Sequence, residues 1–108
     1  MKRRNKMSVN VLGKNNFDIA KSSEKPVLID FYADWCGPCR MVSPIVDQIA
    51  EEHPEYLICK VNVDKEPDLA AEFGVFSIPT IVAMRGGAVV AKAVGARPKA
   101  ELLKLLEG

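Results

Sequence analysis

The first third of the chain alternates between polar segments and short apolar runs of the kind that form strands. Residues 8–12 (SVNVL) predict a short strand, and the polar segment 15–22 predicts a helix. Residues 25–33 (KPVLIDFYA) are almost continuously apolar, which is typical of a central strand covered on both faces. Asp30 is the one acid in that run, so the pattern places a carboxyl group among apolar neighbours.

A helical pattern begins after Cys39. Apolar residues recur at intervals of four in two neighbouring rows, while charged and amide side chains occupy the other positions. The pattern predicts an amphipathic helix that ends near His53 and Pro54. Pro44 lies inside this helix and should kink it, because proline removes one backbone hydrogen bond and crowds the preceding turn. The two rows are Met41, Ile45 and Ile49, and beside them Val42, Val46 and Ala50.

The next two elements are a strand and a short helix. Residues 56–64 (YLICKVNVD) alternate in polarity, which predicts a strand on which Cys59 shares its face with the apolar side chains. Residues 66–74 (EPDLAAEFG) predict a short helix. Gly74 should end it, because glycine readily adopts the left-handed conformation that closes a helix.

The last part of the chain predicts a hairpin followed by a helix. Residues 80–95 contain two strand-like runs joined at Gly86 and Gly87, a pair typical of a two-residue turn. Residues 99–108 (KAELLKLLEG) predict a helix. The order βαβαβαββα fits one three-layer α/β sandwich, with parallel strands early and an antiparallel hairpin late. The final helix should bury one side, made of Leu102, Leu103, Leu105 and Leu106.

The length and the charge distribution predict one domain with a short basic tail. A chain of 108 residues, 48% of them hydrophobic, can bury a core without metal or disulfide staples. Four of its fifteen basic residues lie in the first six positions. The rest of the chain has eleven basic and fourteen acidic residues, so its net charge is negative. We expect a solvated tail at 1–7 and a folded domain at 8–108. A tail that binds nucleic acid or an acidic partner is the weaker alternative, and Met7 is an alternative start.

The chain contains no apolar run long enough to span a bilayer, and its basic start has no apolar stretch behind it. We therefore expect a cytoplasmic protein without membrane or nucleic-acid partners. Structural disulfides are rare in a reducing cytosol, so the pair Cys36 and Cys39 is better explained by catalysis or metal binding.

Ligand count argues against a metal at this pair. A structural zinc site needs four ligands, and the chain offers one CxxC pair, the separate Cys59 and one distant histidine. A CxxC segment at the start of a helix favours a thiolate at its first cysteine, because free backbone N–H groups and the helix dipole stabilise negative charge there. Cys36 is therefore the candidate nucleophile, and Cys39, one turn later, is the candidate resolving thiol. A passive structural pair is the alternative.

The motif WCGPC at 35–39 lies between an apolar strand and a helix, and the chain here resembles the thioredoxin family. The resemblance continues through VLIDFYA, KVNVDKEP, FGVFSIPTIVAMRGG and AVGARPK. It implies a central mixed sheet flanked by helices, and a monomeric protein-disulfide reductase in cell redox homeostasis. The implied active form cycles through a Cys36–Cys39 disulfide without cofactor or metal. Its implied partners are disulfide-containing targets and an NADPH-dependent flavoprotein, thioredoxin reductase.

The resemblance also implies roles for residues outside the motif. Asp30 matches a buried acid that takes the proton of the resolving cysteine, and Lys60 matches a lysine near that acid. From the residues alone, Asp30 could merely face a cavity and Lys60 could simply reach solvent. Pro79 matches a cis-proline beside the cysteines, where Ile78 offers its backbone to a substrate. Gly95 matches a glycine that leaves room for the docked substrate.

Residues within and beside the motif bear on redox poise and substrate choice. Gly37 and Pro38 separate the cysteines and tune the stability of the thiolate, and this pair resembles the reducing members of the family. Trp35, directly before Cys36, is assigned to substrate binding by the same resemblance. Tyr32 stands where relatives usually carry tryptophan.

Two further departures and one extra thiol complete the sequence picture. Phe76 and Ser77 replace a basic residue and a glycine found in many relatives, which bears on target preference and leaves the chemistry intact. Cys59 is expected to be buried and inert, with oxidative regulation as the alternative. The rival functions are a non-catalytic binding module, against which the intact cysteines and Asp30 argue, and a disulfide oxidase or isomerase.

Overall fold

The structure, a computed structural model, describes residues 9–107. Its elements follow the predicted order, so the sequence-based expectation of βαβαβαββα is confirmed. The predicted basic tail at 1–7 lies outside the described residues. The elements are β1 (Val9–Val11), α1 (Asp18–Lys21), β2 (Val27–Tyr32), α2 (Gly37–Glu52), β3 (Leu57–Asn62), α3 (Pro67–Glu72), β4 (Thr80–Arg85), β5 (Ala88–Val94) and α4 (Lys99–Glu107).

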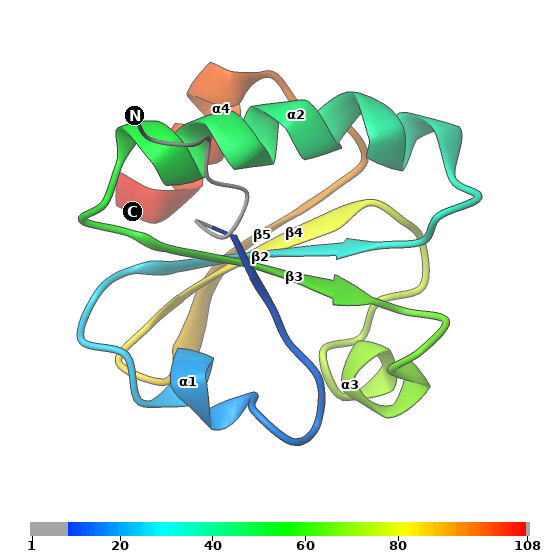
Figure 1. The fold of residues 1–108 in the computed structure, drawn as a ribbon, viewed down its shortest axis with the longest axis horizontal. Coiled ribbons are helices and arrows are strands. Elements are labelled where there is room, and N and C mark those ends of the chain that lie inside the picture. Colours follow the sequence, from blue (N-terminus) through cyan, green and yellow to red (C-terminus); the bar gives the residue numbers. More distant parts are fainter. Residues whose placement is uncertain (1–8, 108) are drawn as a thin grey trace, which may run out of the picture.

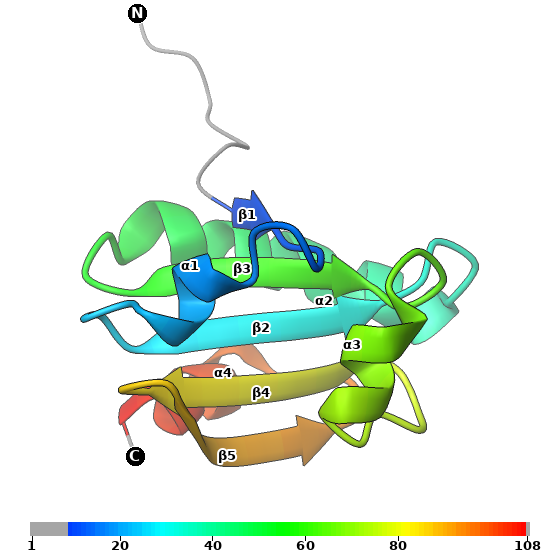
Figure 2. The same ribbon diagram turned by 90° about the horizontal axis from the view of Figure 1, so that it is seen from below.

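The five strands form one mixed sheet in the order β1-β3-β2-β4-β5 (Figure 2). The first three strands in that order run parallel, and β4 pairs antiparallel with both β2 and β5. The strand β2 is therefore central, as its apolar run predicts. Parallel neighbours require helical crossovers, which is why α1 and α2 intervene between the first three strands.

Helices cover both faces of the sheet, which gives the predicted three layers (Figure 1). Helices α2 and α4 lie on one face, and α1 and α3 lie on the other. Burying one aliphatic side chain completely stabilises the fold by about 1.5–3 kcal/mol relative to exposure. The α2/α4 side buries mainly Leu28, Val42, Val46, Ile49, Ile58, Ile81, Leu102 and Leu106, and the α1/α3 side buries mainly Phe17, Ile29, Phe31, Cys59, Val61, Leu69 and Val82.

Strand periodicity places Asp30 on the α2 side of the sheet. Side chains alternate along β2, so Asp30 points to the same face as Leu28, which packs among the α2 and α4 side chains. Lys60 and Ile58 share that face on β3, whereas Cys59 belongs to the opposite core, as predicted. The acid therefore lies beneath the helix that carries both cysteines.

Three details differ from the predicted pattern. Helix α1 is shorter than 15–22, because the Asn16 side chain accepts the Gly13 N–H at 2.7 Å and donates to the Val11 carbonyl at 3.1 Å, which holds a turn before the helix. Met41 is 70% exposed, so only part of its apolar row packs on the sheet. In α4, Leu102 and Leu106 are fully buried while the intervening leucines are partly buried.

The late hairpin and the end of α3 both depend on glycine, as predicted. Gly86 and Gly87 have φ values of 61° and 83°, which are left-handed conformations that suit a two-residue turn. Gly74 follows α3 with φ 65°. Helix α2 continues through Pro44, and the kink there stays a prediction. Between residues 9 and 107, no helix combines the length and the apolar character needed to span a bilayer.

Candidate redox-active site

The site forms where the central strand passes into the longest helix. β2 ends at Tyr32, the Cys36 N–H donates to the Ala33 carbonyl at 3.2 Å, and α2 begins at Gly37. Pro38 occupies the first turn, where a missing N–H costs nothing and its fixed φ suits a helix. The sequence GP between the cysteines therefore starts the helix immediately after Cys36.

Cys36 is the N-cap residue of α2. Its Sγ accepts the backbone N–H of Cys39 at 3.2 Å, so the sulfur occupies the position that a serine or aspartate oxygen takes in other helix caps. The two cysteines form a disulfide with a Cα–Cα separation of 5.2 Å, which confirms the predicted pairing. A thiolate at this position is stabilised by the free N–H groups and the dipole of the helix.

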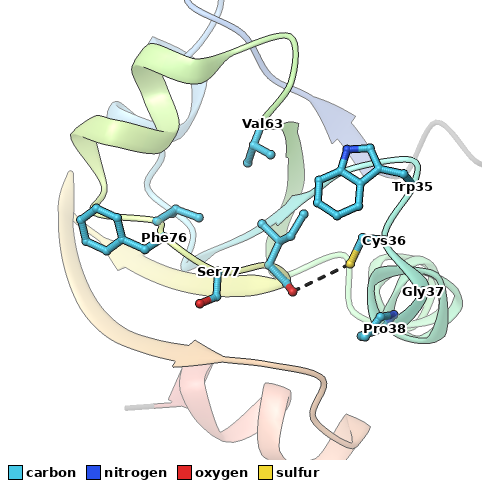
Figure 3. A pocket seen from close by; sticks show the side chains of 9 residues that line it. Trp35, Cys36, Gly37, Pro38, Val63, Phe76 and Ser77 are labelled. Carbon is cyan, nitrogen blue, oxygen red and sulfur yellow. Dashed lines mark hydrogen bonds between the residues drawn. The ribbon is translucent and has the colours of Figure 1, made fainter.

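The two cysteines open onto different cavities. Cys36, with Trp35 and Ile78, lines a groove of about 460 Å³ (Figure 3). Cys39 instead lines a smaller cavity of about 210 Å³ on its other side, together with Lys60. Both cysteines are buried, at 4% and 3% exposure. A substrate in the larger groove therefore reaches Cys36 and not Cys39.

The loop before β4 forms the wall beside Cys36. The Ile78–Pro79 peptide bond is cis, as the sequence predicts. The Ile78 carbonyl oxygen lies 3.8 Å from Cys36 Sγ (Figure 3). The Gly95 N–H donates to the Pro79 carbonyl at 2.8 Å and fixes the loop from β5. A Cβ on Gly95 would meet nothing within 4 Å, so the space next to this residue is open.

Trp35 is held in place although it is 69% exposed. Its Nε1–H donates to Asp64 Oδ2 at 2.8 Å, which fixes the indole at one side of the groove. Asp64 in turn follows Asn62, whose Oδ1 accepts the Asp64 backbone N–H at 2.9 Å. An exposed aromatic ring with a fixed orientation provides an apolar contact surface that costs little conformational entropy on binding.

Asp30 is a buried acid, as predicted. It is 2% exposed, and its Oδ1 has no hydrogen-bond partner within the described part of the chain. Burial raises the pKa of Asp30 from 3.8 to about 7, although the positive charge of Lys60 lowers that pKa and the negative charge of Asp47 raises it slightly. This carboxyl group can therefore exchange a proton near neutral pH.

Lys60 lies beside both Asp30 and the smaller cavity. It is the register partner of Asp30 on β3, and its Nζ lies 5.3 Å from the centre of the Tyr32 ring. That contact is a cation–π interaction, which orients the ammonium group. The predicted proximity of Lys60 and Asp30 is thus observed.

The sequence pattern did not identify several residues of the site. Nothing in the sequence indicated that Asp64 would be the hydrogen-bond partner of Trp35. Asp64 lies in the KVNVDKEP segment, but no periodic pattern marks it. Val63 and Val75 were also missed, because apolar residues after a strand or helix look like ordinary core positions. Within residues 9–107, no three His, Cys, Asp or Glu side chains gather so that they could hold a metal ion.

A disulfide at the N-terminus of a helix, beside a cis-proline loop and above a buried acid, defines a thiol–disulfide oxidoreductase. The thioredoxin family model matches residues 8–108. A thioredoxin from Streptomyces clavuligerus is 52% identical over 87 residues, which cover 81% of this chain and 80% of that protein. The chain belongs to the thioredoxin family, as the motif WCGPC predicts.

Two further comparisons agree with this assignment. A mutant thioredoxin from Halobacterium salinarum has a solved structure that matches with a TM-score of 0.86 at 34% identity, covering 98% of this chain and 94% of that one. A bifunctional thioredoxin reductase/thioredoxin from Mycobacterium leprae is 46% identical over 99 residues, which cover 91% of this chain and 22% of that longer protein. The predicted fold and the predicted thiol–disulfide oxidoreductase activity are thus confirmed.

Proposed function

We propose that this protein reduces disulfides of other proteins with Cys36 as the nucleophile and Cys39 as the resolving thiol. The observation that supports this order most directly is that Cys36 Sγ caps α2 and lines the open groove, while Cys39 faces the other cavity. The capping position stabilises negative charge on the first sulfur and not on the second.

The proposed reaction transfers two electrons to the target in two exchange steps. The Cys36 thiolate attacks one sulfur of the target disulfide, a mixed disulfide forms, and the second target sulfur leaves as a thiolate that takes up a proton. The thiol of Cys39 loses its proton and attacks Cys36 Sγ. The first target sulfur then leaves, and the protein ends with the Cys36–Cys39 disulfide that the structure contains.

Asp30 is the proposed acceptor of the Cys39 proton. It lies on the sheet face beneath α2, and its pKa of about 7 lets it change charge under physiological conditions. Lys60 supports this role, because its charge partly offsets the cost of ionising a buried carboxyl group. Gly37 and Pro38 set the start of the helix and with it the stability of the Cys36 thiolate. Trp35, Ile78, Pro79 and Gly95 are the proposed substrate-binding residues.

The oxidised protein has to be reduced again by a partner. The proposed partner is an NADPH-dependent thioredoxin reductase, and the name of the Mycobacterium leprae relative supports this pairing, because it joins both functions in one protein. We propose a catalytic domain at 8–108 that works as a monomer in the cytoplasm, without a membrane or nucleic-acid partner. A reducing compartment would keep the released target thiols reduced.

Trapping tests the order of the two cysteines. Cys39→Ser should accumulate covalent complexes with target proteins, because the mixed disulfide on Cys36 can no longer be resolved. Cys36→Ser should trap few complexes. Only the parent should reduce insulin disulfides with dithiothreitol as the electron source, and mass spectrometry of the complexes would identify the targets.

If the protein is instead a non-catalytic binding module, the opposite result is expected. This alternative requires that the parent lacks disulfide reductase activity and that both cysteine variants trap the same proteins to the same extent. Complexes that form on Cys36→Ser but not on Cys39→Ser would instead reverse the assigned roles of nucleophile and resolving thiol.

A further inference from the structure

Phe76 is the most exposed large apolar side chain among the described residues. It is 95% exposed, and it lines the same groove as Cys36. Exposing a whole phenylalanine ring to water forgoes the free energy of burying it. An aromatic side chain left uncovered at the edge of a reactive groove suggests that a partner covers it during function.

The backbone on both sides of Phe76 is anchored. The Val75 N–H donates to the Ala70 carbonyl at 2.9 Å, which ties the loop to α3. The Thr80 hydroxyl donates to the Ser77 carbonyl at 2.6 Å, which ties it to the start of β4. Phe76 is therefore presented from a fixed loop, and a partner does not have to order that backbone on binding.

Trp35 stands across the groove from Phe76. Figure 3 shows the two rings on opposite sides of the groove, with Cys36 at the Trp35 side, and Ile78 also lines this groove. The indole is fixed by its hydrogen bond to Asp64. The nine groove residues include no Asp, Glu, Lys, Arg or His, so the groove selects for apolar contact rather than charge; the nine are Trp35, Cys36, Gly37, Pro38, Val63, Val75, Phe76, Ser77 and Ile78.

We infer that Phe76 is a specificity-determining residue, which favours target disulfides that have an aromatic or large aliphatic side chain close to the attacked cysteine. The occupant is an extended segment of a disulfide-containing protein, with its sulfur at Cys36 and its apolar side chain against Phe76. This inference rests on the proposed function. It adds a substrate preference that arises from the loop and not from the cysteines.

Two disulfide-bridged peptides that differ at one position beside the reactive cysteine test the inference. One carries leucine there and the other serine, and dithiothreitol regenerates the enzyme. We expect the parent to favour the leucine peptide by about tenfold in kcat/KM, which corresponds to about 1.4 kcal/mol. Phe76→Ser should reduce that ratio to about twofold, because the apolar contact is lost.

Met41→Ser is the matched control. Met41 is also apolar and 70% exposed, but it lies on α2 and does not line the groove. This variant should keep the parent's ratio of kcat/KM for the two peptides. Thermal unfolding of both variants checks that neither change disturbs the fold, which is expected since both side chains are exposed.

The outcomes separate this inference from the proposed function. A Phe76→Ser protein that keeps the tenfold preference, or that loses kcat/KM equally for both peptides, overturns the specificity role while leaving the reductase intact. A parent that reduces both peptides without preference also overturns the specificity role and leaves the reductase function intact. A parent that reduces neither peptide nor insulin disulfides overturns the proposed function, and the inference with it.

Discussion

Asp30 and Lys60 are direct register partners on β2 and β3, yet no salt bridge joins them within residues 9–107. Asp30 Oδ1 remains without a hydrogen-bond partner in that part of the chain. The lysine therefore acts on the acid through space, and desolvation is the larger influence on the pKa of Asp30. This balance keeps the carboxyl group near the point where it exchanges protons at neutral pH.

Asp30→Asn should change how stability depends on pH. The folded-state pKa of Asp30, about 7, lies above its unfolded value near 3.8, so the stability linked to the neutral acid is fully present below about pH 4, is lost progressively between about pH 4 and pH 7, and changes little above pH 7. The parent should lose up to about 4 kcal/mol relative to the variant over this range. Urea denaturation of the oxidised proteins at pH 4.5, 6 and 8 measures it.

Asp34→Asn serves as the control for this comparison, because Asp34 is an exposed carboxyl group on the loop that follows β2. It should leave the pH dependence of stability close to that of the parent. If the stability difference between Asp30→Asn and the parent stays constant from pH 4.5 to 8, Asp30 does not titrate in the folded protein with a raised pKa.

Removing the charge of Lys60 should raise the pKa of Asp30 further. Lys60→Met keeps an apolar stem of similar length and eliminates the positive charge that favours the carboxylate. The pKa is read from the side-chain carboxyl signal of Asp30 by NMR titration. Lys65→Met removes one exposed lysine from the loop after β3 and is the matched control. Equal titration curves for Lys60→Met and the parent would contradict the coupling.

Cys59 should resist alkylation as long as the protein is folded. It is fully buried among apolar side chains, and burial raises its pKa to about 12. At pH 8 almost none of it is therefore thiolate, which is the reactive form. Mass spectrometry of the reduced protein after iodoacetamide treatment should find label on Cys36 first, and on Cys59 only after unfolding in guanidinium. Rapid labelling of Cys59 in the native protein would revive the alternative of oxidative regulation.

Gly95→Ala should destabilise the protein by about 1–3 kcal/mol, because Gly95 has φ 95°, a conformation that residues with a side chain adopt only under strain. Gly37→Ala is the matched control. An added Cβ meets nothing within 4 Å at either position, so the two changes differ mainly in backbone conformation. Gly37 lies in the first turn of α2, where alanine should not destabilise. Equal midpoints in urea for both variants would refute the backbone argument.

The sequence predicted the fold well where one strong pattern decides the structure. The apolar run around β2 correctly indicated a central strand, and Gly86 with Gly87 correctly indicated the hairpin turn. Asp30 was found because a single acid in such a run is conspicuous. The cysteine pair was singled out by its CxxC spacing before a helix, whereas the cis peptide before Pro79 and the proximity of Lys60 came from the resemblance, and the structure agrees with all three.

Other features depend on contacts that no local pattern reveals. Met41 follows the spacing of a buried row, but at this turn of α2 the neighbouring Val42 is the buried side chain, and Met41 is left exposed. The hydrogen bond from Trp35 to Asp64 joins residues that are 29 positions apart. The separation of Cys36 and Cys39 into two cavities likewise arises only when α2 packs against β3 and the loop before β4.

The groove at Cys36 has walls that come from three separate stretches of the chain: residues 35–38, Val63 and residues 75–78. The acid and both sulfurs belong to a short segment of β2 and α2, whereas Phe76 and its neighbours belong to the loop between α3 and β4. Substitutions of a few residues in this loop can therefore change which target proteins the groove accepts. Such substitutions leave both cysteines and Asp30 in place, so related proteins can acquire different targets while the thiol–disulfide exchange reaction stays the same.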